Sequence, residues 1–205
     1  MKTTENSIFQ LTKNGVEFFF CKKFNSVNNN IDLFKGEYEH YSSLKTLHRR
    51  NEFLGIRFLR NEYDPSLEIS YLESGKPLFK NSLKHVSISH SKNYIGFAAA
   101  PYQIGIDIEE CHERIIKVRD RFMSDSEKKL FDQNSISELT IAWCVKEALF
   151  KLNTNSGIDF KSDLIITDWD KNSMISATMR QDSEWKDVKL YATTFENLVL
   201  CFNFE

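Results

Sequence analysis

The chain has 205 residues and a mass of 24.0 kDa, with 41% hydrophobic residues, 27% charged residues and a formal net charge of −2. This apolar content excludes an intrinsically disordered chain, and the near balance of charge argues against a generally basic nucleic-acid-binding protein. No apolar run approaches the roughly 20 residues of a membrane helix. The start of the chain lacks the apolar core of a signal peptide, and the four cysteines are scattered without a CxxC pair. We therefore expect a cytoplasmic protein with free thiols and no membrane association.

The charge is unevenly distributed along the chain. Residues 1–100 hold 14 Lys and Arg against 10 Asp and Glu, whereas residues 101–205 hold 13 against 19. One interpretation is a chance distribution over solvated surface. The other is a basic half and an acidic half that bind an anion on one side and a metal ion on the other.

The first part of the chain predicts a buried strand over residues 15–21 and a polar loop over residues 25–30. Apolar residues at spacings of three, four and seven predict one long helix within residues 37–60. Alternation predicts a strand over residues 67–72, and the following Gly-Lys-Pro segment predicts a turn over residues 73–77.

Further strands and two helices follow in the middle of the chain. Three strand-like runs lie at residues 86–89, 94–100 and 104–109. Ser124 and Glu127 form a capping-box pattern that predicts a short helix through Phe131. Ser135 and Glu138 repeat the pattern and predict a longer helix through Leu152.

The last part of the chain again predicts strands, at residues 164–167, 174–179, 188–193 and 198–204. The order is strands, helix, strands, helices and strands. This order favours an α+β fold of two halves, a basic half of residues 1–101 and an acidic half of residues 102–205.

The segment Gly105-Ile106-Asp107-Ile108-Glu109 carries the first candidate chemistry. Side chains two apart in a strand share a face, so Asp107 and Glu109 lie together, about 7 Å apart along the strand. Two carboxylates this close repel each other unless a cation or solvent lies between them. The alternatives are a metal site and a solvated acidic strand face.

The segment from Trp143 to Lys151 carries the second group of candidate catalytic residues. Its helical spacing places Trp143, Glu147 and Lys151 on one stripe, with Lys146 on the neighbouring stripe. An exposed Glu–Lys pair would explain this spacing, but the many apolar residues of the helix indicate that it is buried, where charged groups need partners. Glu147 would then add a third carboxylate, and an oxygen-only cluster suits Mg²⁺ or Mn²⁺.

Two weaker motifs lie upstream. Ser87 to Ser91 includes Ser89 and His90, but neighbouring residues rarely form a nucleophile–base pair and no G-x-S-x-G elbow is present. Hydroxyls and an imidazole at a strand end suit phosphate binding, and a structural turn histidine is the alternative. Lys76 in the Gly75–Pro77 turn is compatible with anion binding, although no P-loop is present.

Together the four motifs, Gly75-Lys76-Pro77, Ser89-His90-Ser91, Gly105-x-Asp107-x-Glu109 and Trp143-x-x-Lys146-Glu147-Ala148-x-x-Lys151, resemble the 4′-phosphopantetheinyl transferases of the larger, surfactin-synthetase-activating type. The resemblance covers about residues 49–151. It implies two similar halves related by a pseudo-two-fold axis, and one active site per monomer. The arginine-rich segment from Arg49 to Arg60 also resembles a helix of this family, with Arg57 as the first candidate for a phosphate contact and Arg49 and Arg50 as alternatives.

The resemblance implies transfer of the phosphopantetheine arm of coenzyme A to a serine of an apo acyl or peptidyl carrier protein, with release of 3′,5′-ADP. Asp107, Glu109 and Glu147 would hold Mg²⁺, or Mn²⁺ in its place. Lys151 and Lys146 would neutralise phosphate oxygens, and Glu147 or a metal-bound water would accept the serine proton.

The resemblance also implies that Lys76, Ser89, His90 and Arg57 bind coenzyme A, through its 3′-phosphate. Glu127 matches a glutamate that the family often carries before the tryptophan motif, but its capping-box position gives it a competing local role. The sequence does not identify the carrier.

Two other functions remain. A Mg²⁺-dependent nuclease or phosphohydrolase also clusters carboxylates with a lysine, but its pattern places lysine two residues after the second carboxylate, where this chain has Cys111. A non-enzymatic carrier- or coenzyme-binding protein predicts a broken carboxylate set, whereas all three carboxylates are present.

Overall fold

The computed structural model describes residues 7–23, 31–155 and 157–205. The chain divides into two compact units, Met1–Gln103 and Ile104–Glu205, here named the N-terminal and C-terminal units. Each contains helices and antiparallel sheets, which confirms the mixed α+β class. The polar loop predicted over residues 25–30 lies outside the described residues. None of the helices within the described ranges is both long enough and apolar enough to cross a membrane.

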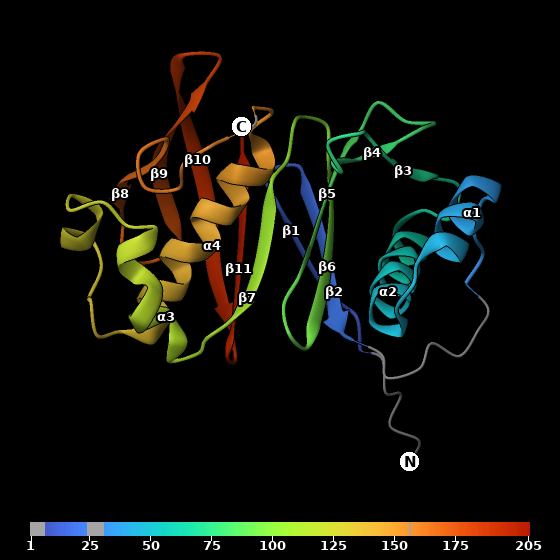
Figure 1. The fold of residues 1–205 in the computed structure, drawn as a ribbon, viewed down its shortest axis with the longest axis horizontal. Helices are drawn as coiled ribbons and strands as arrows, with labels where there is room; N and C mark the ends of the chain where they lie inside the picture. The colour runs from blue at the N-terminus through green and yellow to red at the C-terminus, as the bar shows by residue number, and fades with distance from the viewer. Residues whose placement is uncertain (1–6, 24–30, 156) are drawn as a thin grey trace. The chain divides into compact units, whose positions relative to one another are not determined.

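The N-terminal unit is built on a four-stranded antiparallel sheet of order β1-β2-β6-β5 (Figure 1). Its strands are β1 (Phe9–Lys13), β2 (Val16–Lys22), β5 (His85–His90) and β6 (Tyr94–Ala100). A separate hairpin pairs β3 (Ile69–Tyr71) with β4 (Pro77–Phe79) across the turn at Gly75. The predicted strands of this unit are therefore present, and β1 is an additional edge strand.

The helix predicted within residues 37–60 is instead two helices, α1 (Lys35–Ser43) and α2 (Leu47–Tyr63). The prediction of one helix is wrong because the backbone becomes extended at Leu44, with φ −70° and ψ 126°. Thr46 then caps α2, and its hydroxyl accepts a hydrogen bond from the backbone N of Arg49 at 3.3 Å. The spacing of apolar residues alone does not reveal such a break, because the same periodicity resumes after it.

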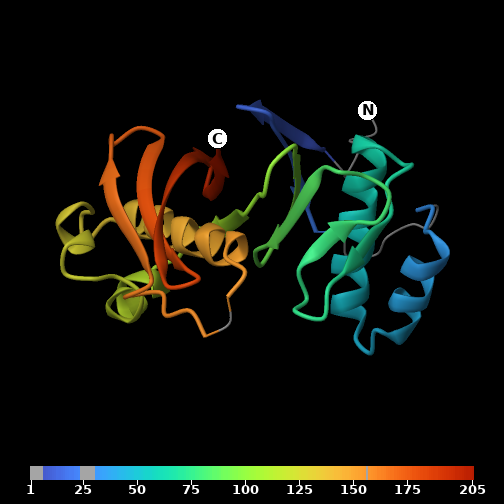
Figure 2. The ribbon, with the colours of Figure 1, turned by 90° about the horizontal axis from the view of Figure 1, so that it is seen from above.

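The C-terminal unit is built on a five-stranded antiparallel sheet of order β7-β11-β10-β9-β8. Its strands are β7 (Ile106–Glu110), β8 (Leu164–Trp169), β9 (Met174–Gln181), β10 (Glu184–Phe195) and β11 (Leu198–Phe204). A 17-residue helix, α4 (Ile136–Leu152), lies along one face of this sheet (Figure 2). The N-terminal unit likewise packs its 17-residue helix α2 on a sheet, and a pseudo-two-fold relation between the units stays a prediction.

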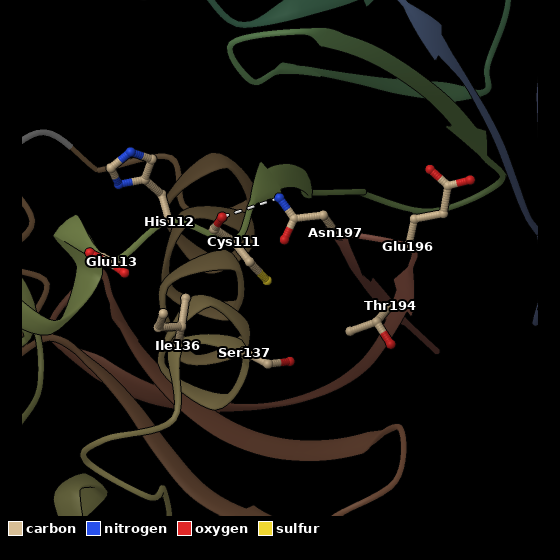
Figure 3. Close-up of a pocket in the computed structure, with 8 residues that line it drawn as sticks. All are labelled: Cys111, His112, Glu113, Ile136, Ser137, Thr194, Glu196 and Asn197. Carbon is tan, nitrogen blue, oxygen red and sulfur yellow. Dashed lines mark hydrogen bonds between the residues drawn. The ribbon is translucent and has the colours of Figure 1, made fainter.

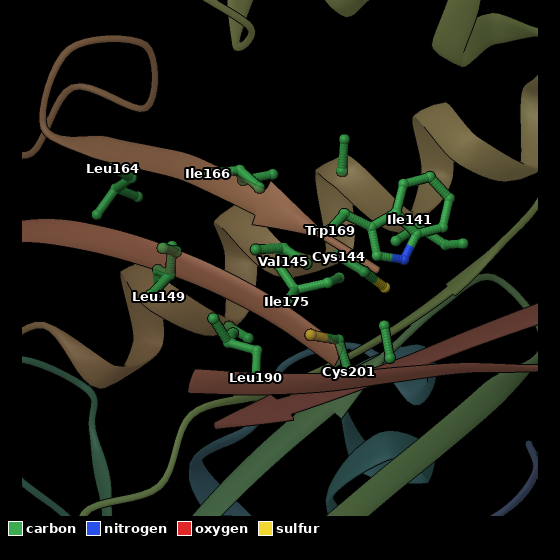
Figure 4. Packing of buried hydrophobic residues seen from close by; sticks show 14 of the residues in the cluster. Ile141, Cys144, Val145, Leu149, Leu164, Ile166, Trp169, Ile175, Leu190 and Cys201 are labelled. Atoms are coloured by element: carbon green, nitrogen blue, oxygen red, sulfur yellow. The ribbon is translucent and has the colours of Figure 1, made fainter. Parts of the chain in front are cut away.

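The core of the C-terminal unit lies between α4 and the sheet (Figure 4). Val145 and Leu149 of α4 have no exposed surface, and they join a cluster with Leu164 and Leu190 of the sheet. Ser135 caps α4 by accepting a hydrogen bond from the backbone N of Glu138 at 3.2 Å, which confirms the helix predicted through Leu152. Packing of this face of α4 on the sheet determines the direction in which each charged side chain of the helix points.

The segment between β7 and α4 is mostly irregular. It contains α3 (Arg114–Val118) and two 3₁₀ turns, Arg119–Arg121 and Glu127–Lys129. The capping-box bonds predicted for Ser124 and Glu127 do form, with Ser124 N donating to Glu127 Oε2 at 2.7 Å. They open only a 3₁₀ turn and not the helix predicted through Phe131, because the backbone nitrogens of Lys129 and Leu130 bond to the oxygens three residues earlier, those of Ser126 and Glu127.

Candidate active site

The strand β7 carries the two carboxylates predicted from the Gly-x-Asp-x-Glu motif. Its neighbours Ile106 and Ile108 have no exposed surface, while Asp107 is buried and Glu109 is partly buried. β7 is an edge strand paired with β11, where Asp107 lies opposite Cys201. The alternation of side chains along this edge strand places Asp107 and Glu109 on one face.

Gly105 explains how α4 comes so close to this strand. A Cβ atom at Gly105 would lie 2.1 Å from the backbone oxygen of Ala148 and 2.8 Å from the backbone nitrogen of Leu152. The strand and the last turn of α4 therefore meet backbone to backbone, which only glycine permits. This contact brings the last turn of α4, with Lys151, to the carboxylate face.

Both oxygens of the Asp107 carboxylate have partners on α4. Lys151 Nζ lies 2.9 Å from Asp107 Oδ1 and also donates to the backbone oxygen of Ile106 at 2.9 Å. Cys144 Sγ donates to Asp107 Oδ2 at 3.2 Å. Lys151 keeps 26% of its side chain exposed, so its ammonium lies at the edge of the core rather than inside it.

The carboxylates of Glu109 and Glu147 have too little positive charge nearby to keep their pKa values at the usual 4.5. Burial, together with the charges of Asp107, Glu110 and Glu147, raises the pKa of Glu109 to about 7. Burial and the charge of Asp107 also raise the pKa of Glu147 to about 7, against a lowering by Lys151. The three predicted carboxylates therefore act on one another electrostatically, as a candidate site requires.

Within the described ranges, no three His, Cys, Asp or Glu side chains form a ready-made metal cluster. The chemistry of the donors nevertheless fits Mg²⁺. Asp107, Glu109 and Glu147 offer only oxygen ligands, and the raised pKa values of the two glutamates show that added positive charge would stabilise their ionised forms. These residues could hold a magnesium ion.

Lys146, predicted to contact coenzyme A, is placed elsewhere. Its ammonium has no exposed surface, lies 2.6 Å from Glu127 Oε1, and donates to the backbone oxygens of Phe160 and Leu164. An ammonium has three N–H donors, so these partners use all of them. We therefore omit Lys146 from the phosphate contacts, and Glu127 is a structural partner of Lys146 and a helix cap.

The N-terminal unit holds the other predicted binding residues. Ser89 and His90 end β5, where Ser89 is buried and His90 keeps 45% of its side chain exposed. Lys76 lies in the turn before β4, which packs against β5, and burial lowers the pKa of its ammonium. The turn itself needs glycine, because Gly75 adopts a φ of +83°.

Arg57, the first candidate for a phosphate contact, is inside the N-terminal unit. Its side chain is 1% exposed, its Nε lies 3.2 Å from Glu37 Oε1, and its NH1 donates to Tyr71 Oη at 2.8 Å. Its alternative Arg50 donates to the backbone oxygen of Leu44. Arg49 is 65% exposed, so the structure favours Arg49 over Arg57.

Sequence reasoning missed Glu52, which lies beside both Arg49 and His90. The signal was present as helical spacing, since Glu52 stands four residues after His48 and three after Arg49. Its contact with His90 comes from another strand and could not be found by spacing.

A cavity of about 490 Å³ opens beside the end of β7 and the start of α4 (Figure 3). Burial raises the pKa of the Cys111 thiol, while hydrogen bonding to Thr140 and Ser137 lowers it. The lining residues are Cys111, His112, Glu113, Ile136, Ser137, Thr194, Glu196 and Asn197. None of the predicted site residues lines this cavity.

Comparison with known proteins shows what the residues of the carboxylate face are similar to. Residues 103–202 match the family model described as the 4′-phosphopantetheinyl transferase superfamily. The match covers slightly less than half of the chain. The matched residues include β7, α4 and the face that they form, whereas Lys76, Ser89 and His90 lie before them.

A named relative agrees with this match. The chain is 29% identical over 100 residues to the 4′-phosphopantetheinyl transferase gsp of Aneurinibacillus migulanus. The match covers 47% of this chain and 37% of that relative. The match leaves most of the relative's length uncovered.

Proposed function

We propose that this protein transfers the 4′-phosphopantetheine arm of coenzyme A to a serine of an apo carrier protein and releases 3′,5′-ADP. The observation that carries the proposal is the cluster of Asp107, Glu109, Glu147 and Lys151 within the residues that match the transferase superfamily model. In the reaction a bond forms between the serine oxygen and phosphorus, and the phosphorus–oxygen bond to 3′,5′-ADP breaks.

Each residue of the cluster has a proposed role. Asp107, Glu109 and Glu147 would hold Mg²⁺, which when bound supplies positive charge for the pyrophosphate. Lys151, whose side chain is partly exposed on α4, binds a non-bridging phosphate oxygen. Glu147 accepts the serine proton as the general base.

The N-terminal unit would bind the coenzyme. Lys76, Ser89 and His90 offer an ammonium, a hydroxyl and an imidazole within one unit, and Arg49 takes the place first given to Arg57. Such groups suit the adenosine 3′-phosphate. The proposed division is a coenzyme-binding half of residues 1–101 and a metal-binding, catalytic half of residues 102–205, in a cytoplasmic monomer.

The direct experiment incubates the protein with coenzyme A, Mg²⁺ and a panel of apo acyl and peptidyl carriers, and reads the intact mass of each carrier. We expect one phosphopantetheine to be added to at least one carrier. Asp107→Ala should abolish transfer and the rise in melting temperature that Mg²⁺ causes. The matched control is Glu184→Gln, at an exposed position of β10.

Glu147→Gln separates binding from chemistry. The variant keeps a neutral oxygen ligand but removes the proton acceptor, so it should bind coenzyme A nearly as well and transfer slowly. If the Asp107→Ala enzyme modifies a carrier at the native rate, the carboxylates have no catalytic role and form only a solvated strand face.

A further inference from the structure

Four basic side chains of the N-terminal unit converge on the carboxylate of Glu52. Lys23, after β2, places Nζ 2.7 Å from Oε1, and His90, at the end of β5, places Nδ1 3.3 Å from the same oxygen. From α2 itself, His48 Nε2 lies 3.1 Å from Oε1 and Arg49 NH1 lies 3.4 Å from Oε2. One carboxylate thus joins residues from three parts of the unit.

The carboxylate is buried, but most of its partners are not. The side chain of Glu52 is 8% exposed, whereas those of His48, Arg49 and His90 are 68%, 65% and 45% exposed. Burial acts to raise the pKa of Glu52, but the hydrogen bond from Lys23 and the charges of His90, Lys23 and His48 lower it overall. Glu52 is therefore an ionised, buried carboxylate that contacts the exposed basic side chains of His48, Arg49 and His90.

This arrangement differs from the other buried carboxylate of the unit, Glu37. The arginines bound to Glu37 are 1% and 0% exposed, so their charges are enclosed with it. Glu52 instead contacts each group through one atom and leaves the outer part of the group at the surface. With Nδ1 of His90 facing Glu52, Nε2 is on the opposite side of the ring.

We propose that Glu52 is a positioning residue, which orients His90 and Arg49 for binding the 3′-phosphate of coenzyme A. The inference rests on the proposed function. A carboxylate held close to one ring nitrogen of a histidine favours the ring orientation in which the other nitrogen meets a ligand, as in metal-bound histidines. The same contact limits the directions available to the Arg49 guanidinium, which otherwise samples many rotamers.

The experiment measures the ratio of KM for dephospho-coenzyme A to KM for coenzyme A, with the full-length protein. Glu52→Gln should lower this ratio by about three- to tenfold, because orientation of the phosphate-binding groups is lost. The kcat with dephospho-coenzyme A should not change. The matched control is Glu62→Gln, at an exposed position of the same helix, which should leave the ratio at the wild-type value.

The outcomes separate this inference from the proposed function. A wild-type protein that transfers from neither substrate refutes the function itself. A wild-type protein that discriminates the substrates, with an equal ratio in Glu52→Gln, overturns the role of Glu52 alone. Should Glu52→Gln fail to fold, Glu52→Asp keeps the charge but withdraws it from His90, and an unchanged ratio there also overturns the role.

Discussion

Glu37 in the N-terminal unit and Glu147 in the C-terminal unit are both withdrawn from water, but only Glu37 is fully neutralised. Glu37 accepts hydrogen bonds from Arg57 at 3.2 Å, from Arg60 at 3.1 Å and from the backbone N of Ile69 at 3.0 Å. Glu147 instead lies near the charge of Asp107, which together with burial raises its pKa to about 7.

The C-terminal unit contains both kinds of carboxylate. Glu127 is paired with Lys146 and accepts from the backbone N of Ile166 at 2.8 Å. Glu109 and Glu147 carry raised pKa values. A buried carboxylate that is neutralised by its partners has a structural role. Carboxylates that repel one another instead mark a candidate site at which a bound cation would neutralise their charge.

The largest effect is expected at the neutralised carboxylate. Glu37→Ala leaves Arg57 and Arg60 buried beside each other without a counter-charge, so the free energy of unfolding should fall by about 3–5 kcal/mol. Denaturant unfolding measures this change. Glu39→Ala, at an exposed position of the same helix, should change stability by less than about 0.5 kcal/mol. Equal effects at the two positions would contradict the assignment.

The next effect concerns the contact between β7 and α4. Gly105→Ala places a methyl group 2.1 Å from a backbone oxygen of α4, so strand and helix must separate, and we expect a loss of about 3 kcal/mol. Gly75→Ala is the comparison, because it meets no atom within 4 Å and adds only the strain of φ +83°, about 1 kcal/mol. A Gly105→Ala protein as stable as wild type would show that the close approach is not needed.

The same glycine shows what the sequence alone could predict. The alternation of Ile106, Asp107, Ile108 and Glu109 and the helix ending at Leu152 were both readable, because each depends on local periodicity. The backbone contact at Gly105 joins residues more than 40 positions apart, and no pattern within either element reveals it.

For the charged residues, too, the sequence predicts the local spacing but not the long-range contacts. The sequence could place Lys146 and Lys151 on neighbouring helical stripes but not say which one enters the core. The structure pairs Lys146 with Glu127 and with the backbone oxygens of Phe160 and Leu164, and it pairs Lys151 with Asp107. Arg57 was likewise chosen by motif, and its partner Glu37 lies across the break that divides the predicted helix.

A smaller effect is expected from pH. The folded protein holds protons on Glu109 and Glu147 up to about pH 7, whereas the unfolded chain loses them near 4.5. The metal-free protein should therefore lose stability as pH rises from about 4.5 to about 7, and no further above it. A shift of this size corresponds to about 3.4 kcal/mol per group, but both side chains are partly exposed and solvent screening reduces the effect, so we expect a loss on the order of 1–3 kcal/mol from this pair.

Thermal unfolding across that range, with and without Mg²⁺, measures the loss. Glu147→Gln removes one ionisable group and should reduce the slope between pH 4.5 and 7. Mg²⁺ should flatten the profile of the wild type. A slope in Glu147→Gln equal to that of the wild type would mean that Glu147 contributes nothing to the pH dependence, and that its pKa is not raised in the folded protein.

The smallest effect compares the N-cap residues of the two 17-residue helices. Ser135 caps α4 and Thr46 caps α2, each through one hydroxyl that accepts from the backbone nitrogen three residues later, at 3.2 and 3.3 Å. Replacement by Ala should cost about 1 kcal/mol at either position. Ser135→Ala has no local substitute, because the Glu138 carboxylate accepts from Asp132 N and pairs with Lys171. Denaturant unfolding of the two variants measures the costs. If neither differs from wild type, the caps are dispensable and packing of each helix on its sheet alone determines where it begins.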